Sequence, residues 1–89
     1  MIVLVCWGLA TAGATDEGPV GQYLMSYDVD AHDGRGTAAF TDDLTQALTF
    51  HTIGDAIDTW RTQSTVRPKR DDGMPNRPLT AFSMEPRAL

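Results

Sequence analysis

The feature that most constrains the fold is the apolar run IVLVCW at residues 2–7. Its β-branched residues favour extended backbone, and apolar side chains at successive positions place apolar groups on both faces of a strand. The run therefore predicts a buried strand. A cleaved leader is the alternative, because the small residues AGA at 12–14 resemble a signal-peptidase site. No Lys or Arg precedes Arg35, whereas a signal peptide needs a positive start, and the run is too short to cross a bilayer. We therefore favour the strand and expect no membrane association.

Alternation and turn-forming residues predict two more strands after this run. Tyr23, Met25 and Tyr27 fall on one face of an extended segment, with Leu24 on the other. The chain is dense in Gly, Asp and Thr before and after that segment. The expected order is a loop at 11–21, a strand at 22–27, turns at 28–36 and a strand at 37–41.

Helical spacing is clear in the second half of the chain. Ile53, Ala56, Ile57 and Trp60 recur at i, i+3, i+4 and i+7, which predicts a helix over 53–63 with this stripe facing the core. Thr52 is expected to cap the helix, with Asp55 three residues later. A shorter helix is predicted over 43–50, starting from the good N-cap residues Asp42 and Asp43.

The last third combines a long irregular segment with a final strand. Residues 64–78 show no periodicity and contain Pro68, Pro75 and Pro78, so they predict a long Pro/Arg-rich loop. A strand is expected over 79–85, stopped by Pro86. The whole chain, 1–89, then predicts a single α+β domain. Its two layers would be a mostly antiparallel sheet of three to four strands and, on one face, one short and one longer helix.

Composition and cysteine content exclude several classes. Apolar residues make up 42% of the chain and charged residues 21%, values that disfavour disorder, collagen and coiled coil. Cys6 is the single cysteine, which rules out an intramolecular disulfide framework and multi-cysteine metal sites. Inside an apolar run it is expected to act as a small hydrophobe. A reducing setting, the cytoplasm, is the expected location.

Charge is unevenly distributed along the chain, whose formal net charge is −5. Residues 1–58 hold nine acids and one base, giving −8, and residues 59–89 hold six bases and three acids, giving +3. The net charge argues against coating nucleic acid, but the basic part permits local contact with phosphate or with an acidic protein face. The competing interpretation is that these bases pair with Asp71, Asp72 or the acidic half. The basic loop at 61–77 comprises Arg61, Arg67, Lys69, Arg70 and Arg77.

Motifs for metal binding or catalysis are weak. An EF-hand loop starting at Asp28 needs Gly at its sixth position and Glu at its twelfth, where this chain has Asp33 and Ala39. No nucleophile elbow, Cys/His spacing, phosphate-binding Gly loop or zinc-protease motif occurs. We therefore expect no cofactor and no metal. A small enzyme or metal-binding protein centred on His32, with Asp28 or Asp33, is kept as a second alternative.

Several stretches together resemble a group of small uncharacterised proteins encoded by bacteriophages and prophages. The similarity covers about residues 22–85. The stretches that carry it are YLMSYD at 23–28, AHDGRG at 31–36, TDD at 41–43, QALTF at 46–50, WRTQS at 60–64, RP at 67–68 and DGMPNRPLTAF at 72–82.

The resemblance implies a phage or prophage accessory protein that binds a host protein, such as a counter-defence inhibitor. It assigns no residue roles and leaves the oligomeric state open. On this hypothesis an acidic face contacts a basic host surface. Its members are Asp28, Asp30, Asp33, Asp42 and Asp43. Nucleic-acid contact through the basic loop at 61–77 is the alternative.

Overall fold

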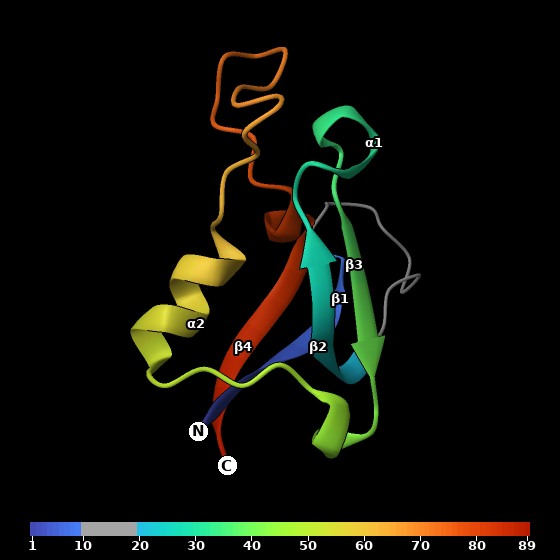
Figure 1. Cartoon of the computed structure of the whole chain (residues 1–89), viewed down its shortest axis with the longest axis vertical. Coiled ribbons are helices and arrows are strands. Elements are labelled where there is room, and N and C mark those ends of the chain that lie inside the picture. The colour runs from blue at the N-terminus through green and yellow to red at the C-terminus, as the bar shows by residue number, and fades with distance from the viewer. Residues whose placement is uncertain (10–19) are drawn as a thin grey trace.

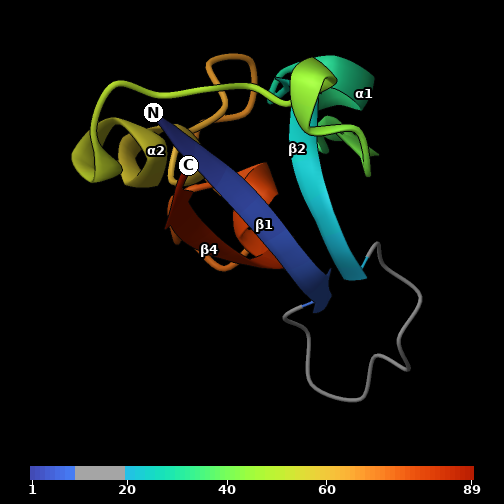
Figure 2. The same cartoon turned by 90° about the horizontal axis from the view of Figure 1, so that it is seen from below.

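Strand β1 lies inside a four-stranded antiparallel sheet of order β3-β2-β1-β4, in a computed structural model that describes residues 1–9 and 20–89. Figure 2 shows β1 between its two neighbours. The chain ends meet at one end of the molecule, where the Leu89 amide donates to the Met1 carbonyl at 2.9 Å (Figure 1). The strands are β1 (Ile2–Leu9), β2 (Val20–Asp28), β3 (Thr37–Thr41) and β4 (Phe82–Ala88).

The buried strand predicted from the apolar run is confirmed. Val3, Leu4, Val5 and Cys6 have no exposed surface, because β2 and β4 pair with the two edges of β1 and side chains cover both of its faces. Burial raises the pKa of the Cys6 thiol, as expected for a cysteine that packs as a hydrophobe. The predicted strands at 22–27 and 37–41 are confirmed as β2 and β3.

Helix α2 (Ile53–Trp60) packs against β1 and β4, and its predicted cap is confirmed. The Thr52 hydroxyl accepts from the Asp55 amide at 3.1 Å. The predicted stripe is wrong at its first position. Ala56 is fully buried in the core, but Ile53 is 51% exposed. The helix also stops at Trp60 rather than at 63, since Ser64 pairs through its amide with the Asn76 carbonyl.

The predicted helix over 43–50 is wrong. Only a 3₁₀ turn, η1 (Leu44–Gln46), forms there, started by the Asp43 side chain. Beyond it the backbone is extended, because Phe50 exchanges two backbone hydrogen bonds with Ile2, at 2.7 and 2.9 Å. Tertiary hydrogen bonds to the sheet replace the helical ones.

The final strand is shifted along the chain from its predicted place. A 3₁₀ turn, η2 (Pro78–Ala81), occupies the expected beginning, and β4 continues to Ala88. The expectation that Pro86 stops the strand is wrong, since Pro86 pairs with Leu4. Because β4 is an edge strand, a residue without an N–H is tolerated there.

The connections around β2 position the candidate site. Most of the predicted loop at 11–21 lies outside the described residues. The predicted turns at 28–36 contain α1 (Ala31–Gly34), a four-residue helical turn. Figure 1 shows α1 beyond the ends of β2 and β3, and α2 packed against the sheet. The predicted α+β domain, an antiparallel sheet with one short and one longer helix, is confirmed.

Candidate functional site

The segment at 64–76, which we call the arm, contains no helix or strand and folds back on itself. The Asn76 amide donates to the Pro68 carbonyl at 2.9 Å and the Arg70 amide to the Met74 carbonyl at 2.8 Å. At the tip, the Gly73 amide donates to the Arg70 carbonyl at 2.9 Å, with Gly73 at a φ of +84° that suits glycine. The arm therefore extends as a short hairpin from the end of the sheet, beside α1 (Figure 1).

Asp30 anchors the arm to the turn before α1. Its carboxylate accepts four hydrogen bonds: from the Ser64 hydroxyl at 2.8 Å, the Thr65 amide at 2.7 Å, the Thr65 hydroxyl at 2.6 Å and the Val66 amide at 3.2 Å. These bonds, that from the Thr65 hydroxyl first, lower the pKa of Asp30 from 3.8 to about 2. Asp30 thus joins segments more than thirty residues apart and is engaged within the molecule.

Replacement of Asp30 by asparagine is expected to loosen the base of the arm at neutral pH. Amide exchange at Thr65 and Val66 should quicken by about tenfold, since charge-assisted hydrogen bonds become neutral ones. Because the folded pKa is depressed, the carboxylate stabilises the native state fully above about pH 5, and this contribution disappears as the pH falls toward 2. The wild-type and Asp30→Asn proteins should therefore differ in urea midpoint at pH 7 and converge near pH 2.

Asp42→Asn is the matched control, because Asp42 is an exposed carboxylate outside the arm with no hydrogen bond among the described residues. It should leave exchange at Thr65 and Val66 unchanged. Equal exchange in the Asp30→Asn and wild-type proteins would show that Asp30 does not anchor the arm.

A second set of contacts holds the arm against α1. The Asn76 side-chain amide donates to the Gly34 carbonyl at 2.6 Å and to the Arg67 carbonyl at 2.9 Å. Gly34 has a φ of +90°, and a Cβ built on it would lie 2.5 Å from the Arg67 Cβ. The arm thus rests on bare glycine backbone, and its position depends on the absence of a side chain there.

His32 and Asp33 precede that glycine with φ values of 53° and 58°, in the left-handed region that is rare for such residues. Both side chains are exposed, and with Arg35 and Arg67 they line a shallow hollow. Among residues 1–9 and 20–89, no group of three or more His, Cys, Asp or Glu side chains is placed to hold a metal ion. Catalysis centred on His32 stays a hypothesis.

Arginines gather where the arm meets α1, around two adjacent hollows. The first hollow, about 430 Å³, contains carboxylates as well as arginines, and the second, about 420 Å³, contains arginines and no carboxylate. The first is lined by Gly34, Arg35, Arg67, Arg70, Asp71, Asp72 and Asn76. The second is lined by Arg35, Arg70, Pro75, Asn76, Arg77, Pro78, Thr80 and Ala81. Because Arg35, Arg70 and Asn76 line both, the two hollows form one continuous surface, which we call the arginine surface.

Ion pairs occupy part of this surface. Arg67 pairs with Asp71, and Arg70 with Asp72 at 3.3 Å, as the pairing interpretation of the basic loop expects. All four side chains are exposed, so each pair contributes little to stability and is easily exchanged for another anion. Within the described part of the chain no ion pair involves Arg35, Lys69 or Arg77.

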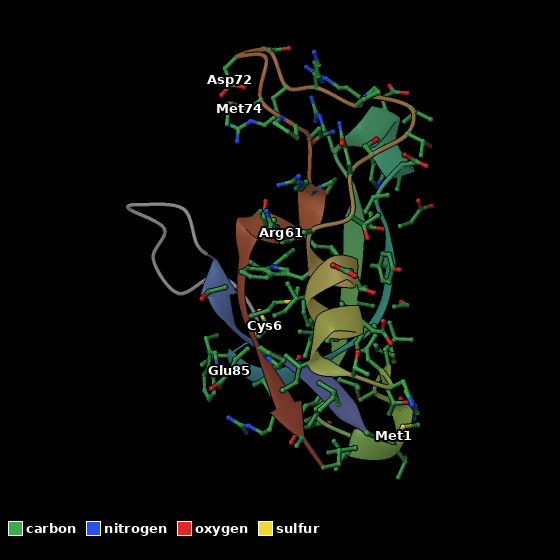
Figure 3. The ribbon with its side chains drawn as sticks, turned by 90° about the vertical axis from the view of Figure 1, so that its left-hand side faces the viewer. Met1, Cys6, Arg61, Asp72, Met74 and Glu85 are labelled. Carbon is green, nitrogen blue, oxygen red and sulfur yellow. The ribbon has the colours of Figure 1, made fainter. Side chains whose placement is uncertain are left out.

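The predicted basic loop only partly coincides with the arginine surface. Arg67, Arg70 and Arg77 belong to it, whereas Arg61 lies at the base of the arm as the C-cap of α2, away from the tip marked by Asp72 and Met74 (Figure 3). Lys69 is exposed on the arm outside both hollows.

Arg35 and Asn76 are the site residues that sequence reasoning missed. Arg35 stands between Gly34 and Gly36, and a base between two glycines in a turn was the available signal. For Asn76 the sequence held no such signal, because its role is to hold the arm through the distant Gly34 carbonyl.

The structure does not bring the five predicted acidic residues onto one surface. Asp28 pairs with the first residue of β3, and Asp30 and Asp33 follow it, whereas Asp42 and Asp43 come after the last residue of β3, at its opposite end. Asp28 accepts from the Asp30 amide at 2.9 Å. Hydrogen bonds from the Thr45 hydroxyl and amide lower the pKa of Asp43. Host-protein binding by these carboxylates stays a prediction.

Comparison with known proteins adds no assignment: no protein-family model, curated protein or solved structure matches this chain. The resemblance to phage and prophage proteins stays a prediction accordingly. No helix in the described part of the chain is long and apolar enough to span a bilayer.

Proposed function

We propose that this protein binds nucleic acid, and that the arginine surface contacts the phosphate backbone. The observation that carries the proposal is that arginines from separate segments of the chain meet on one surface. Arg35 follows α1, Arg67 and Arg70 lie in the arm and Arg77 precedes η2, yet all four line two adjoining hollows. A run of phosphates can lie across both hollows, whereas a small anion fills only one.

Arginine chemistry supports this choice of ligand. A guanidinium presents a rigid fork of donors that matches two phosphate oxygens and is always charged. The arm is held by Asp30 and Asn76, so these arginines extend from a preorganised backbone and lose less entropy on binding. The pairs with Asp71 and Asp72 are exposed and can yield to phosphate.

The net charge of −5 limits the strength of the interaction. Contact is expected with only about three or four phosphates, which makes binding modest and dependent on salt. For a single strand, raising the salt from about 50 to about 200 mM should weaken binding by about 20- to 50-fold.

Fluorescence anisotropy with a 3′-labelled oligonucleotide of about 20 nucleotides, single-stranded or duplex, tests the proposal. Arg35→Ala is the informative variant, because Arg35 is exposed, lines both hollows and forms no ion pair with another described residue. It should reduce affinity by about tenfold at low salt and lower the slope of log affinity against log salt by about one.

Arg87→Ala is the matched control. It removes the same charge, but from β4, which ends near the N-terminus (Figure 1). There Arg87 lies over the Trp7 ring and beside Glu85. Its affinity and salt slope should equal those of the wild type. The proposal is wrong if neither oligonucleotide binds at low salt, or if the Arg35 and Arg87 variants behave alike.

A further inference from the structure

The second hollow differs from the first in its charge. Three arginines line it, Arg35, Arg70 and Arg77, and its lining includes no carboxylate. One of the three, Arg70, also pairs with Asp72 at 3.3 Å across the first hollow. The second hollow is therefore more positive than the first, although the protein as a whole is acidic.

Arg77 lines this hollow and is only partly exposed. Its Nε atom is buried and has no hydrogen-bond partner among the described residues. Its backbone is fixed, because the Arg77 carbonyl accepts from the Thr80 amide at 3.0 Å and from the Thr80 hydroxyl at 2.6 Å. A buried N–H without a partner is costly, so a shift of the Arg77 guanidinium toward an anion in the hollow would relieve that cost.

Charge matching indicates which anion. A phosphodiester within a strand carries one negative charge, whereas a terminal phosphomonoester carries nearly two at pH 7, with three acceptor oxygens. Three guanidiniums without a carboxylate match the dianion better than the diester. The volume of about 420 Å³ accommodates a nucleotide attached to that phosphate.

We infer that the second hollow binds a terminal phosphomonoester, carried by the 5′-end of a nucleic acid or by a free mononucleotide. For the 5′-end of a nucleic acid, the inference rests on the proposed function. For a free mononucleotide it does not. The ligand's phosphate lies among the guanidiniums of Arg35, Arg70 and Arg77. The rest of a strand then continues over the first hollow toward Arg67.

The test compares two 3′-labelled oligonucleotides of one sequence, with a 5′-phosphate or a 5′-hydroxyl. The wild-type protein should bind the phosphorylated form about tenfold more tightly at pH 7, and the preference should shrink near pH 5, as the phosphate loses its second charge. An unlabelled 5′-mononucleotide and inorganic phosphate serve as competitors. Competition by the mononucleotide at a concentration similar to the phosphorylated oligonucleotide indicates a free nucleotide, and its absence indicates a strand end.

Two variants separate the hollows. Arg77→Lys keeps a charge but loses the Nε donor and the fork, so it should abolish the preference for 5′-phosphate. Of the two hollows of the arginine surface, Arg67 lines only the first, so Arg67→Ala should weaken binding of both oligonucleotides while keeping their ratio. Equal binding of the two oligonucleotides by the wild type overturns this inference and leaves the proposed function standing. If the mononucleotide binds but neither oligonucleotide does, this inference stands and the proposed function is wrong.

Discussion

Replacement of Gly34 by alanine is expected to lower the free energy of unfolding by about 3 kcal/mol and to displace the arm. Two costs combine at this position. The φ of +90° is unfavourable for any residue with a Cβ, and the new Cβ would meet the Arg67 Cβ at 2.5 Å and the Ser64 hydroxyl at 3.0 Å. The contact with Arg67 cannot be relieved by rotating a side chain, because both atoms are fixed to backbone. Urea denaturation gives the stability, and amide exchange at Thr65 gives the state of the arm.

Gly73→Ala is the matched control for this prediction. Gly73 has a φ of +84°, but a Cβ there would have nothing within 4 Å. The control should therefore cost only about 1 kcal/mol, the conformational part, and should leave exchange at Thr65 unchanged. Similar losses of stability in the two variants would mean that the close contact at Gly34 contributes nothing.

Replacement of Trp60 by alanine is expected to cost about 3–4 kcal/mol. The indole packs against the core at the end of α2, and its N–H donates to the Leu79 carbonyl at 3.0 Å and to the Phe82 carbonyl at 3.1 Å. The variant therefore creates a cavity and leaves two carbonyls without their donor. It also frees η2, whose Thr80 holds the Arg77 carbonyl in the second hollow.

The control for Trp60 lies on the same helix. Ile53 was predicted to face the core but is about half exposed, so Ile53→Ala should change stability by no more than about 0.5 kcal/mol. Chemical denaturation of both variants tests the pair. A large loss at Ile53, or a loss of less than about 1 kcal/mol at Trp60, would contradict the packing described for α2.

The acidic net charge and the arginine surface are compatible because carboxylates near the arm are engaged locally. Asp30 accepts four hydrogen bonds within the fold, and Asp71 and Asp72 pair with arginines of the arm. Net charge describes the long-range field of a protein, whereas phosphate recognition depends on the few donors within hydrogen-bonding distance. A chain with a charge of −5 can therefore present a positive hollow.

The sequence by itself determined the elements whose signals are local. An apolar run produced β1, alternation produced β2, and a side-chain cap with helical spacing produced α2. The predictions were wrong for the helix at 43–50 and for the beginning of β4. In both places hydrogen bonds to distant residues decide the backbone, and sequence periodicity carries no information about such partners.

Only the tertiary structure decided the candidate site. The pairing of Asp30 with Thr65 spans 35 residues and that of Asn76 with Gly34 spans 42, and neither follows from spacing. Arg35 reaches the arginines of the arm because the antiparallel sheet brings the turn after β2 to the same end as the arm. Packing of the core positions the backbone that carries the surface arginines. The neighbours of these charged residues therefore depend on contacts made elsewhere in the molecule.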